Sequence, residues 1–506
     1  MVASEAKFTF AELATAQHNL KNLGLYDGEI DGLYGKLSAA AFLQFANALS
    51  IDTILDANSR LLTDQLLQIP SVVRHLLDIL GEGDRLFLKF TNAQRIFVNM
   101  GQADHNYLGF LDRGIYGCQT GKKKSLPNRS FAPSPLLNHL PDYADRLSNL
   151  PDGVNVVSYG QVAMLAGTKV RVKFQPYPAI GQIPNIENIG LEFLDKSIEN
   201  ACISIGSVVN GQMLCRWIGR NPLSNVQFWS STKILPLLYT ITAANRADFI
   251  QPIANCLVSG SNESGSGRTF LELAERICSY EEEGSMTSNA LSAGFKQFAT
   301  PSALENWLEK ITGNQNLAFR GRYGEKPYFE KPTLSSPTGT KILTGEREAH
   351  RGDNLISAYD LTRVLSQIAW HRHIPPAQRI PAAQWHSLTS LIRAMGQDTA
   401  RYVDVAIAAL GLPYFISDPV VISKMGFGYS DQRKQTELTY TACIQFIDRL
   451  ALSDDGLPLP KLRSVNMTLR AVLNLKDSAR EALEIDARMA ATVTEILRRI
   501  VTEELI

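Results

Sequence analysis

Hydrophobic residues recur at helical spacing near both ends of the chain. Leu13, Ala16, Leu20 and Leu23 lie three or four residues apart and therefore share one face of a helix. Near the C-terminus, SAREALEIDARMAATVTEILRRIVTEEL has the spacing of a single amphipathic helix. The pattern predicts a small helical region at the start of the chain and a long helix at its end that packs against a core.

From residue 188 onward the hydrophobic pattern predicts strands as well as helices. ACISIGSVVNGQMLCRWIGR contains two β-rich runs that meet at Asn210-Gly211, a dipeptide favoured in two-residue hairpin turns. Much later, TELTYTACIQFIDRL alternates as a strand. Strands at both ends of a segment, with helices between them, favour one antiparallel sheet assembled from distant parts of the sequence.

The pattern is least informative over residues 66–187. GDRLFLKFTNAQRIFVNMG indicates a hairpin, and GTKVRVKFQPYP indicates another strand. GKKKSLPNRSFAPSPLL is a polar loop whose lysines are typical of a solvated surface. We treat this segment as a linker or accessory region of unknown role.

Composition narrows the classes of function. At 506 residues, with 45% hydrophobic and 20% charged residues, the chain is long enough for several globular domains. Its 50 basic and 50 acidic residues balance, which argues against nucleic acid and an anionic membrane surface as partners. The six cysteines form no CxxC pair, and His371 and His373 lack a third ligand at metal-binding spacing. We therefore expect no metal and no organic cofactor.

FWSSTKILPLL, residues 228–238, places Ser230 and Lys233 three residues apart at the start of an apolar run. On a helix the two side chains share one face, one turn apart. Lys233 could then accept the proton of Ser230 if burial and neighbouring positive charge lower its pKa. A lone S-x-x-K also arises by chance, so the spacing alone leaves both interpretations open.

The N-terminal region contains LGLYDGEIDGLYG, residues 23–35, in which two Asp-Gly dipeptides favour tight turns. A simple turn would explain it. The stretch also resembles the small three-helix peptidoglycan-binding domain of cell-wall enzymes, and this resemblance implies a domain of that kind over residues 1–65. The matching positions are Leu23, Gly24, Tyr26, Gly28, Ile30, Asp31, Gly32, Tyr34, Gly35 and the later Phe45.

Two further motifs follow Ser230 and Lys233. LVSGSNESGSG, residues 257–267, offers an S-x-N type of element, and DPVVISKMGFGYSDQR contains Lys424-Met425-Gly426. The order S-x-x-K, S-x-N, K-T-G resembles that of the penicillin-recognising serine hydrolases, which include class A β-lactamases and D,D-peptidases. The resemblance covers residues 190–506 and implies an α+β domain of β-lactamase/transpeptidase-like fold, with helices packed on an antiparallel sheet.

The resemblance implies a role for each matching residue. Ser230 would be the acylated nucleophile, and Lys233 would accept its proton. Lys424 would bind the terminal carboxylate of the substrate, and Gly426 would let the substrate backbone approach the strand. The backbone N–H groups of Ser230 and Phe427 would form the oxyanion hole.

The chain departs from the family pattern in three places. Met425 lacks the hydroxyl that usually helps to hold the substrate carboxylate. The second motif fits in more than one register; we favour Asn262 as the amide that binds the substrate, with Ser261 or Ser259 supplying the catalytic hydroxyl. Between residues 319 and 355 no Glu is followed four residues later by Asn, so efficient β-lactamase activity is not expected.

The sequence therefore predicts a multidomain protein. Residues 1–65 would bind peptidoglycan, and residues 188–506 would form a serine hydrolase that cleaves D-Ala-D-Ala-like or related amide bonds through an acyl-serine intermediate. Two other interpretations stay open. The chain could be a catalytically degenerate protein that binds cell wall, or an esterase or amidase of the same fold.

The expected location follows from what the N-terminus lacks. MVASEAKFTFAELATAQHNL has neither the basic start nor the continuous apolar stretch of a secretory signal, and no apolar run approaches the roughly 18 residues of a membrane span. We expect no membrane insertion. The protein would be cytoplasmic, or would reach its partner, peptidoglycan or its stem peptides, through a secretion or injection apparatus.

Overall fold

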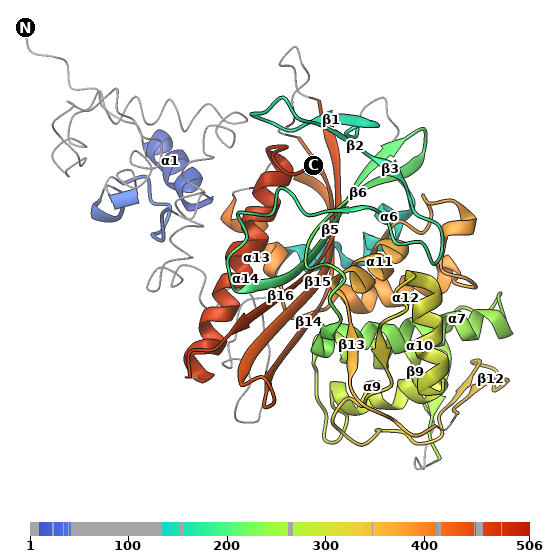
Figure 1. The fold of residues 1–506 in the computed structure, drawn as a ribbon. Helices are drawn as coiled ribbons and strands as arrows, with labels where there is room; N and C mark the ends of the chain where they lie inside the picture. Colours follow the sequence, from blue (N-terminus) through green and yellow to red (C-terminus); the bar gives the residue numbers. More distant parts are fainter. Residues whose placement is uncertain are drawn as a thin grey trace, which may run out of the picture.

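The computed structural model is drawn in Figure 1. It describes residues 10–22, 25–33, 35–38, 40–41, 134–150, 156–261, 267–346, 348–410, 412, 416–449, 451, 459–476 and 478–506. The hairpin predicted for residues 83–101 lies outside these residues, as does Asn262. The predicted domain boundaries stay predictions.

The largest sheet among the described residues has seven strands and is antiparallel except where β4 pairs with β6. Its order is β14-β15-β16-β5-β6-β3, so strands from the C-terminal region lie beside strands more than two hundred residues earlier. This confirms the predicted sheet assembled from distant segments. The strands are β3 Gln175–Pro176, β4 Ile186–Glu187, β5 Ile198–Val209, β6 Gln212–Arg220, β14 Ile416–Ser430, β15 Gln435–Asp448 and β16 Lys461–Leu473.

The turn between β5 and β6 is the one predicted from Asn-Gly. Asn210 and Gly211 have φ angles of 52° and 73°. Two consecutive positive φ values twist a two-residue turn in the direction that the strands need, and Asn and Gly tolerate them best.

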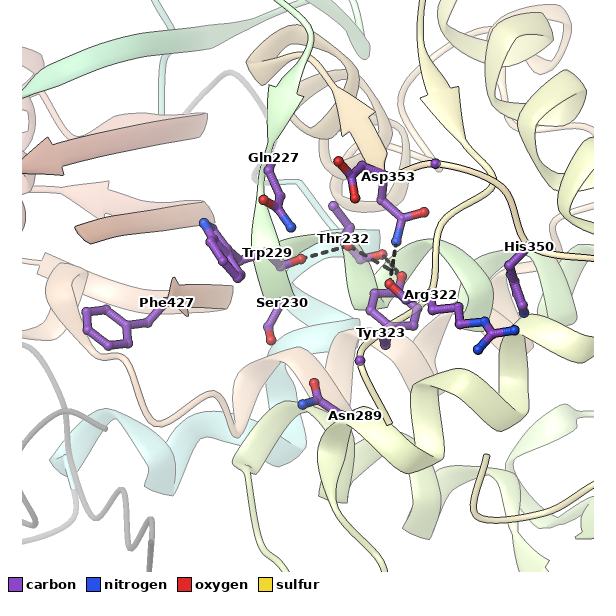
Figure 2. A pocket seen from close by; sticks show the side chains of 13 residues that line it. Gln227, Trp229, Ser230, Thr232, Asn289, Arg322, Tyr323, His350, Asp353 and Phe427 are labelled. Carbon is purple, nitrogen blue, oxygen red and sulfur yellow. Dashed lines mark hydrogen bonds between the residues drawn. The ribbon is translucent and has the colours of Figure 1, made fainter. Parts of the chain in front are cut away.

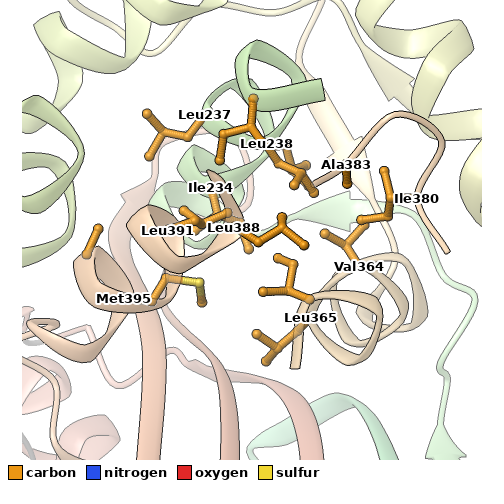
Figure 3. Close-up of a cluster of buried hydrophobic side chains, with 14 of the residues drawn as sticks. Ile234, Leu237, Leu238, Val364, Leu365, Ile380, Ala383, Leu388, Leu391 and Met395 are labelled. Atoms are coloured by element: carbon orange, nitrogen blue, oxygen red, sulfur yellow. The ribbon is translucent and has the colours of Figure 1, made fainter. Parts of the chain in front are cut away.

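Helices cover both faces of the sheet (Figure 1). On β5, Cys202 belongs to the core under α7, α11 and α12, whereas its neighbour Ile203 belongs to the core under α13 and α14. Figure 3 shows leucine, isoleucine and valine side chains of α7, α11 and α12 packing together. No described helix is long and apolar enough to cross a membrane. The helices are α6 Tyr143–Ser148, α7 Ile234–Ala247, α8 Phe270–Ser279, α9 Ser288–Phe295, α10 Pro301–Thr312, α11 Ala358–Ala369, α12 Trp385–Gly396, α13 Tyr402–Ala409 and α14 Ser478–Val501.

Short strands bring separate loops to one place. β13, Asn354–Ile356, pairs on one side with β7, Val226–Gln227, and on the other with β10, Ala318–Phe319. Chain segments near residues 229, 322 and 353 therefore meet beside the N-terminus of α7. The remaining short elements are β1 Val162–Met164, β2 Arg171–Lys173, β8 Leu257–Ser259, β9 Arg268–Thr269, β11 Thr333–Ser335, β12 Lys341–Thr344 and the 3-10 helices η4 Pro135–Asp142, η5 Trp229–Lys233, η6 Ile253–Asn255, η7 Lys296–Phe298 and η8 Pro376–Gln378.

The described part of the N-terminal region is a helix followed by a fixed loop. In α1, Phe10–Asn22, the buried side chain of Gln17 donates to Asp31 Oδ1 at 2.7 Å and to the Leu33 carbonyl at 2.9 Å, and it accepts from the Gly32 N–H at 2.8 Å. The predicted first helix and structured loop are confirmed. The later part of the expected domain, including Phe45, lies outside the described residues, and the three-helix domain is not confirmed.

Candidate active site

Ser230 lies in η5, a tight turn that leads directly into α7. Trp229, just before it, has a φ of 46°, a strained value for a side chain of this size. Two hydrogen bonds hold Trp229 in this conformation. Its indole donates to Glu437 at 2.8 Å, and Thr232 donates to its carbonyl at 2.7 Å. The fold thus fixes the backbone on which Ser230 stands.

The side chain of Ser230 faces a cavity of about 630 Å³ (Figure 2). No residue in the described part of the chain hydrogen bonds to its hydroxyl, which is therefore available to a ligand. The walls come from η5, α9, β14 and the two loops near residues 322 and 352. They consist of Gln227, Trp229, Ser230, Thr232, Asn289, Arg322, Tyr323, Gly324, His350, Gly352, Asp353, Asn354 and Phe427.

Lys233 is the last residue of η5, and its side chain points into the protein interior. Its side chain is 2% exposed, and its amine donates to Ser288 Oγ at 2.9 Å. Burial, followed by the charge of Lys424, holds the pKa of Lys233 well below that of a free lysine, although Glu325 and Glu282 oppose the shift. A lysine that loses its proton this readily can serve as a base.

The structure does not bring Ser261 to Ser230 and Lys233. Ser261 is exposed, and both its N–H and its hydroxyl donate to the carbonyl of Glu330, at 2.8 and 3.2 Å. The hydroxyl beside Lys233 belongs to Ser288, which passes its own hydrogen bond to the Ile277 carbonyl at 2.9 Å. Ser288 follows Thr287, the N-cap of α9, and a Thr-Ser-Asn at a helix start was the sequence signal available for it.

Asn289 supplies the amide in the cavity wall. It faces Ser230 in Figure 2, and its Nδ2 donates to Glu325 Oε1 at 2.9 Å. The other oxygen of Glu325 accepts from Thr287. Because Glu325 takes the amide nitrogen, the Asn289 carbonyl oxygen is oriented as an acceptor for a ligand N–H. Ser288 and Asn289 are adjacent instead of two residues apart as in S-x-N, so the sequence pattern favoured Asn262 for this amide.

Lys424 lies on β14 but does not line the cavity. Its side chain is 0% exposed, and its Nζ lies 3.4 Å from the centroid of the Tyr280 ring and 3.9 Å from Asp398 Oδ1. Tyr280 is held in place because its hydroxyl donates to the Met425 carbonyl at 2.5 Å. In this arrangement the ammonium group lies beside Asp398 and is covered by Tyr280, contrary to the expected contact with a substrate carboxylate.

The space beside Gly426 is filled by the protein's own backbone at η5 and not left open for the backbone of a substrate. A Cβ at this position would lie 2.6 Å from the Ser230 nitrogen and 2.8 Å from the Phe228 carbonyl oxygen. The close approach is tied by Thr439, which donates to the Phe228 carbonyl at 2.9 Å, and by Ser231, which donates to the Lys424 carbonyl at 2.9 Å. The glycine allows η5 to sit directly on the edge of the sheet.

Gly426→Ala is expected to move Ser230 away from β14. A displacement of about 1 Å at a reacting atom lowers the rate about 10²-fold, so acylation of Ser230 should fall by that order while the protein stays folded. Rates with an activated ester, together with circular dichroism, check this. Gly35→Ala is the control, because an added Cβ there meets nothing within 4 Å. Equal rates for both variants would contradict the role given to Gly426.

A buried lysine that the sequence did not reveal braces the loop above the cavity. Lys296 is 2% exposed, and its amine donates to the Gly321 carbonyl and to Asn354 Oδ1, both at 2.7 Å. Burial lowers the pKa of Lys296 to about 7. The loop also contacts η5, since the Tyr323 hydroxyl donates to the Thr232 carbonyl at 3.2 Å.

Lys296 should make stability depend on pH. In the unfolded chain a lysine keeps its proton up to about pH 10.4, whereas Lys296 loses it near pH 7 when folded. The unfolded state binds more protons between these values, so the free energy of unfolding rises with pH. The slope is proportional to the number of protons that the unfolded state binds in excess of the folded state, and Lys296→Met should lower that number by up to about one. Urea unfolding between pH 7 and 10 measures it, exposed Lys326→Met should keep the slope, and an unchanged slope in Lys296→Met would refute the assignment.

The histidines considered as metal ligands are engaged otherwise. A ring nitrogen of His373 lies 2.9 Å from the Leu147 carbonyl, and His371 stacks on Trp385 with centroids 6.1 Å apart. Within the described residues, no group of three or more His, Cys, Asp or Glu side chains is placed to hold a metal ion.

Comparison with known proteins gives partial structural matches. No family model and no curated protein sequence matches the chain. The β-lactamase from Desulfarculus baarsii is 15% identical, with a TM-score of 0.34 over 60% of this chain and 92% of that one. PBP-A is 11% identical, with a TM-score of 0.36 over 62% and 99% of the two chains. L2 in complex with relebactam is 12% identical, with a TM-score of 0.32 over 59% and 91%. These matches give no support to the predicted N-terminal peptidoglycan-binding domain.

Proposed function

We propose that the chain is a serine hydrolase that forms a covalent acyl intermediate on Ser230. The observation that carries the proposal is a partly exposed serine at the wall of a cavity of about 630 Å³, followed three residues later in the same turn by a buried lysine. Burial lowers the pKa of Lys233, so its amine can act as a base at a lower pH than the amine of an exposed lysine. A serine needs such a base, because its hydroxyl is a weak nucleophile.

The reaction would proceed in two balanced halves. Ser230 Oγ attacks the substrate carbonyl carbon, and its proton passes to the Lys233 amine. Collapse of the tetrahedral intermediate breaks the bond to the leaving nitrogen or oxygen, which receives the proton through the Ser288 hydroxyl. Water then attacks the acyl-serine, and the same groups return the proton to Ser230 as the acid leaves.

The oxyanion would be bound by the N–H groups of Ser230 and Phe427. β14 is an edge strand, and the Met425 carbonyl on its outer side accepts from Tyr280. Residues two apart along a strand face the same way, so the N–H of Phe427 points out from the same edge. Donors placed where charge develops are worth about 3–4 kcal/mol each in known acyl-transfer sites.

For the substrate we propose a D-Ala-D-Ala-like stem peptide or a related amide of peptidoglycan. The support comes from the sequence motifs, and from LGLYDGEIDGLYG as a wall-binding element that would raise the effective concentration of tethered substrate. The earlier suggestion of a secretion or injection apparatus has no supporting observation.

A second candidate is an esterase or amidase whose substrate has no carboxylate beside the scissile bond. The covered position of Lys424 favours it, since this lysine is engaged by Asp398 and Tyr280. Met425, which has no hydroxyl to offer a carboxylate, points the same way.

The two candidates and the degenerate alternative are separated by one experiment. The protein is incubated with a labelled penicillin and, separately, with a neutral activated ester, and intact mass is recorded for the native protein and Ser230→Ala. Adducts from both probes support the peptidase, and an ester adduct alone supports the second candidate. Absence of any Ser230-dependent adduct would support the third interpretation, a catalytically degenerate protein that binds cell wall.

A further inference from the structure

Lys424, the cation expected on the β14 side of the Ser230 cavity, does not line that cavity. Lys424 is fully buried, paired with Asp398 and covered by the Tyr280 ring. Uncovering it would break the hydrogen bond from Tyr280 to the Met425 carbonyl and expose an ion pair. A substrate carboxylate therefore needs another partner in this cavity.

Arg322 lies on the opposite side and is available. Its side chain is exposed and lines both the Ser230 cavity and an adjoining cavity of about 440 Å³. No carboxylate in the described part of the chain forms an ion pair with it. Figure 2 shows its guanidinium extending toward His350 and away from Asp353, the acidic residue in the same wall.

The backbone that carries Arg322 is held rigidly. Lys296 binds the Gly321 carbonyl at 2.7 Å, Asn354 donates to the Arg322 carbonyl at 3.2 Å, and Tyr323 is bonded to η5. A long cationic side chain on a fixed backbone can reach a ligand with little loss of main-chain entropy.

Charged groups of both signs lie near Arg322. After burial itself, Lys296 in its protonated form lowers the pKa of His350, and Arg322 adds to that effect. Two acids of the adjoining cavity are already engaged: Glu325 accepts from Thr287 and Asn289, and Glu348 accepts from the N–H and hydroxyl of Ser302. Glu330 and Glu346 also line that cavity.

We propose that Arg322 binds the anionic group of the substrate in place of Lys424. The inference rests on the proposed function and adds its specificity: the substrate is an acyl compound with a carboxylate, and the carboxylate lies on the Arg322 side of the cavity. Arg322 is then the residue that separates charged from neutral substrates.

The test measures binding without turnover, in the Ser230→Ala background. Calorimetric titration compares acetyl-D-Ala-D-Ala with its C-terminal amide, which replaces the carboxylate by a neutral group of similar size. The carboxylate is expected to bind at least about tenfold more tightly, with the preference shrinking between 50 and 500 mM NaCl as the charges are screened. Adding Arg322→Gln should bring the two ligands within about twofold, as expected for loss of one charged hydrogen-bonded contact. Lys326→Gln, which removes an exposed lysine four residues away, should leave the preference intact.

Three results would overturn the proposal: no preference for the carboxylate, a preference that survives Arg322→Gln, or one that Lys424→Gln alone removes. Arg322 is exposed, so its variant is expected to fold, and a thermal melt verifies this. Acylation of the native protein by a neutral ester reports separately on the proposed function. If that acylation fails while the binding preference depends on Arg322, the site binds anionic ligands without catalysing their cleavage.

Discussion

Ser230→Ala will lower acylation by an activated ester at least about 10³-fold, because loss of a catalytic nucleophile leaves only binding and oxyanion stabilisation. The hydroxyl makes no hydrogen bond within the described residues, so the melting temperature should hardly change. The measurement is a stopped-flow acylation rate, with thermal unfolding beside it.

Ser231→Ala is the matched control for that experiment. Ser231 is fully buried and bonds to the Lys424 carbonyl and to Thr439, both at 2.9 Å. Its removal should cost about 1 kcal/mol of stability, as for a typical buried hydrogen bond. The bond from Thr439 to the Phe228 carbonyl still holds η5 against β14, so acylation should fall far less than in Ser230→Ala. If Ser231→Ala lost activity as completely as Ser230→Ala, the choice of nucleophile would be in doubt.

Lys233→Met will give the second large effect, a loss of about 10²- to 10⁴-fold in acylation, the usual contribution of a positioned base. Methionine fills the buried space without a charge, so the fold should persist. Lys310→Met is the control, since Lys310 is an exposed lysine of α10 that does not line the cavity, and this variant should keep the native acylation rate.

The pH profile distinguishes a base from a structural residue. Burial and Lys424 lower the pKa of Lys233 well below 10.5, and only the neutral amine accepts a proton. The acylation rate of the native protein should therefore rise with pH and level off below pH 10.5. In Lys233→Met this rise should be absent. A profile that is the same in both proteins would remove Lys233 from the reaction.

The sequence anticipated those parts of the site that depend on local spacing. Ser230 and Lys233 belong to one turn, and Gly426 and Phe427 to one strand, so their relative placement follows from secondary structure. The Asn210-Gly211 turn and the C-terminal helix were predictable for the same reason.

The parts that depend on tertiary contacts were not predictable. Ser288 reaches Lys233 only because the start of α9 lies beside the end of η5 and beside Ile277 of α8, and its spacing matches no motif. Tyr280 precedes three glutamates, Glu281 to Glu283, and no local spacing indicates that its ring covers Lys424. Arg322 and Lys296 come together with Ser230 through the pairing of β7, β13 and β10, which joins segments up to about 130 residues apart.

The central claim is that an acyl group forms a bond to Ser230, and peptide mapping after reaction with the activated ester tests it most directly. The acylated protein is digested, and the modified residue is located by fragmentation of the peptide that contains FWSSTK. The account predicts the added mass on Ser230, absent from Ser230→Ala and strongly reduced in Lys233→Met. An acyl group on any other residue, or an unmodified Ser230 in folded protein, would contradict it.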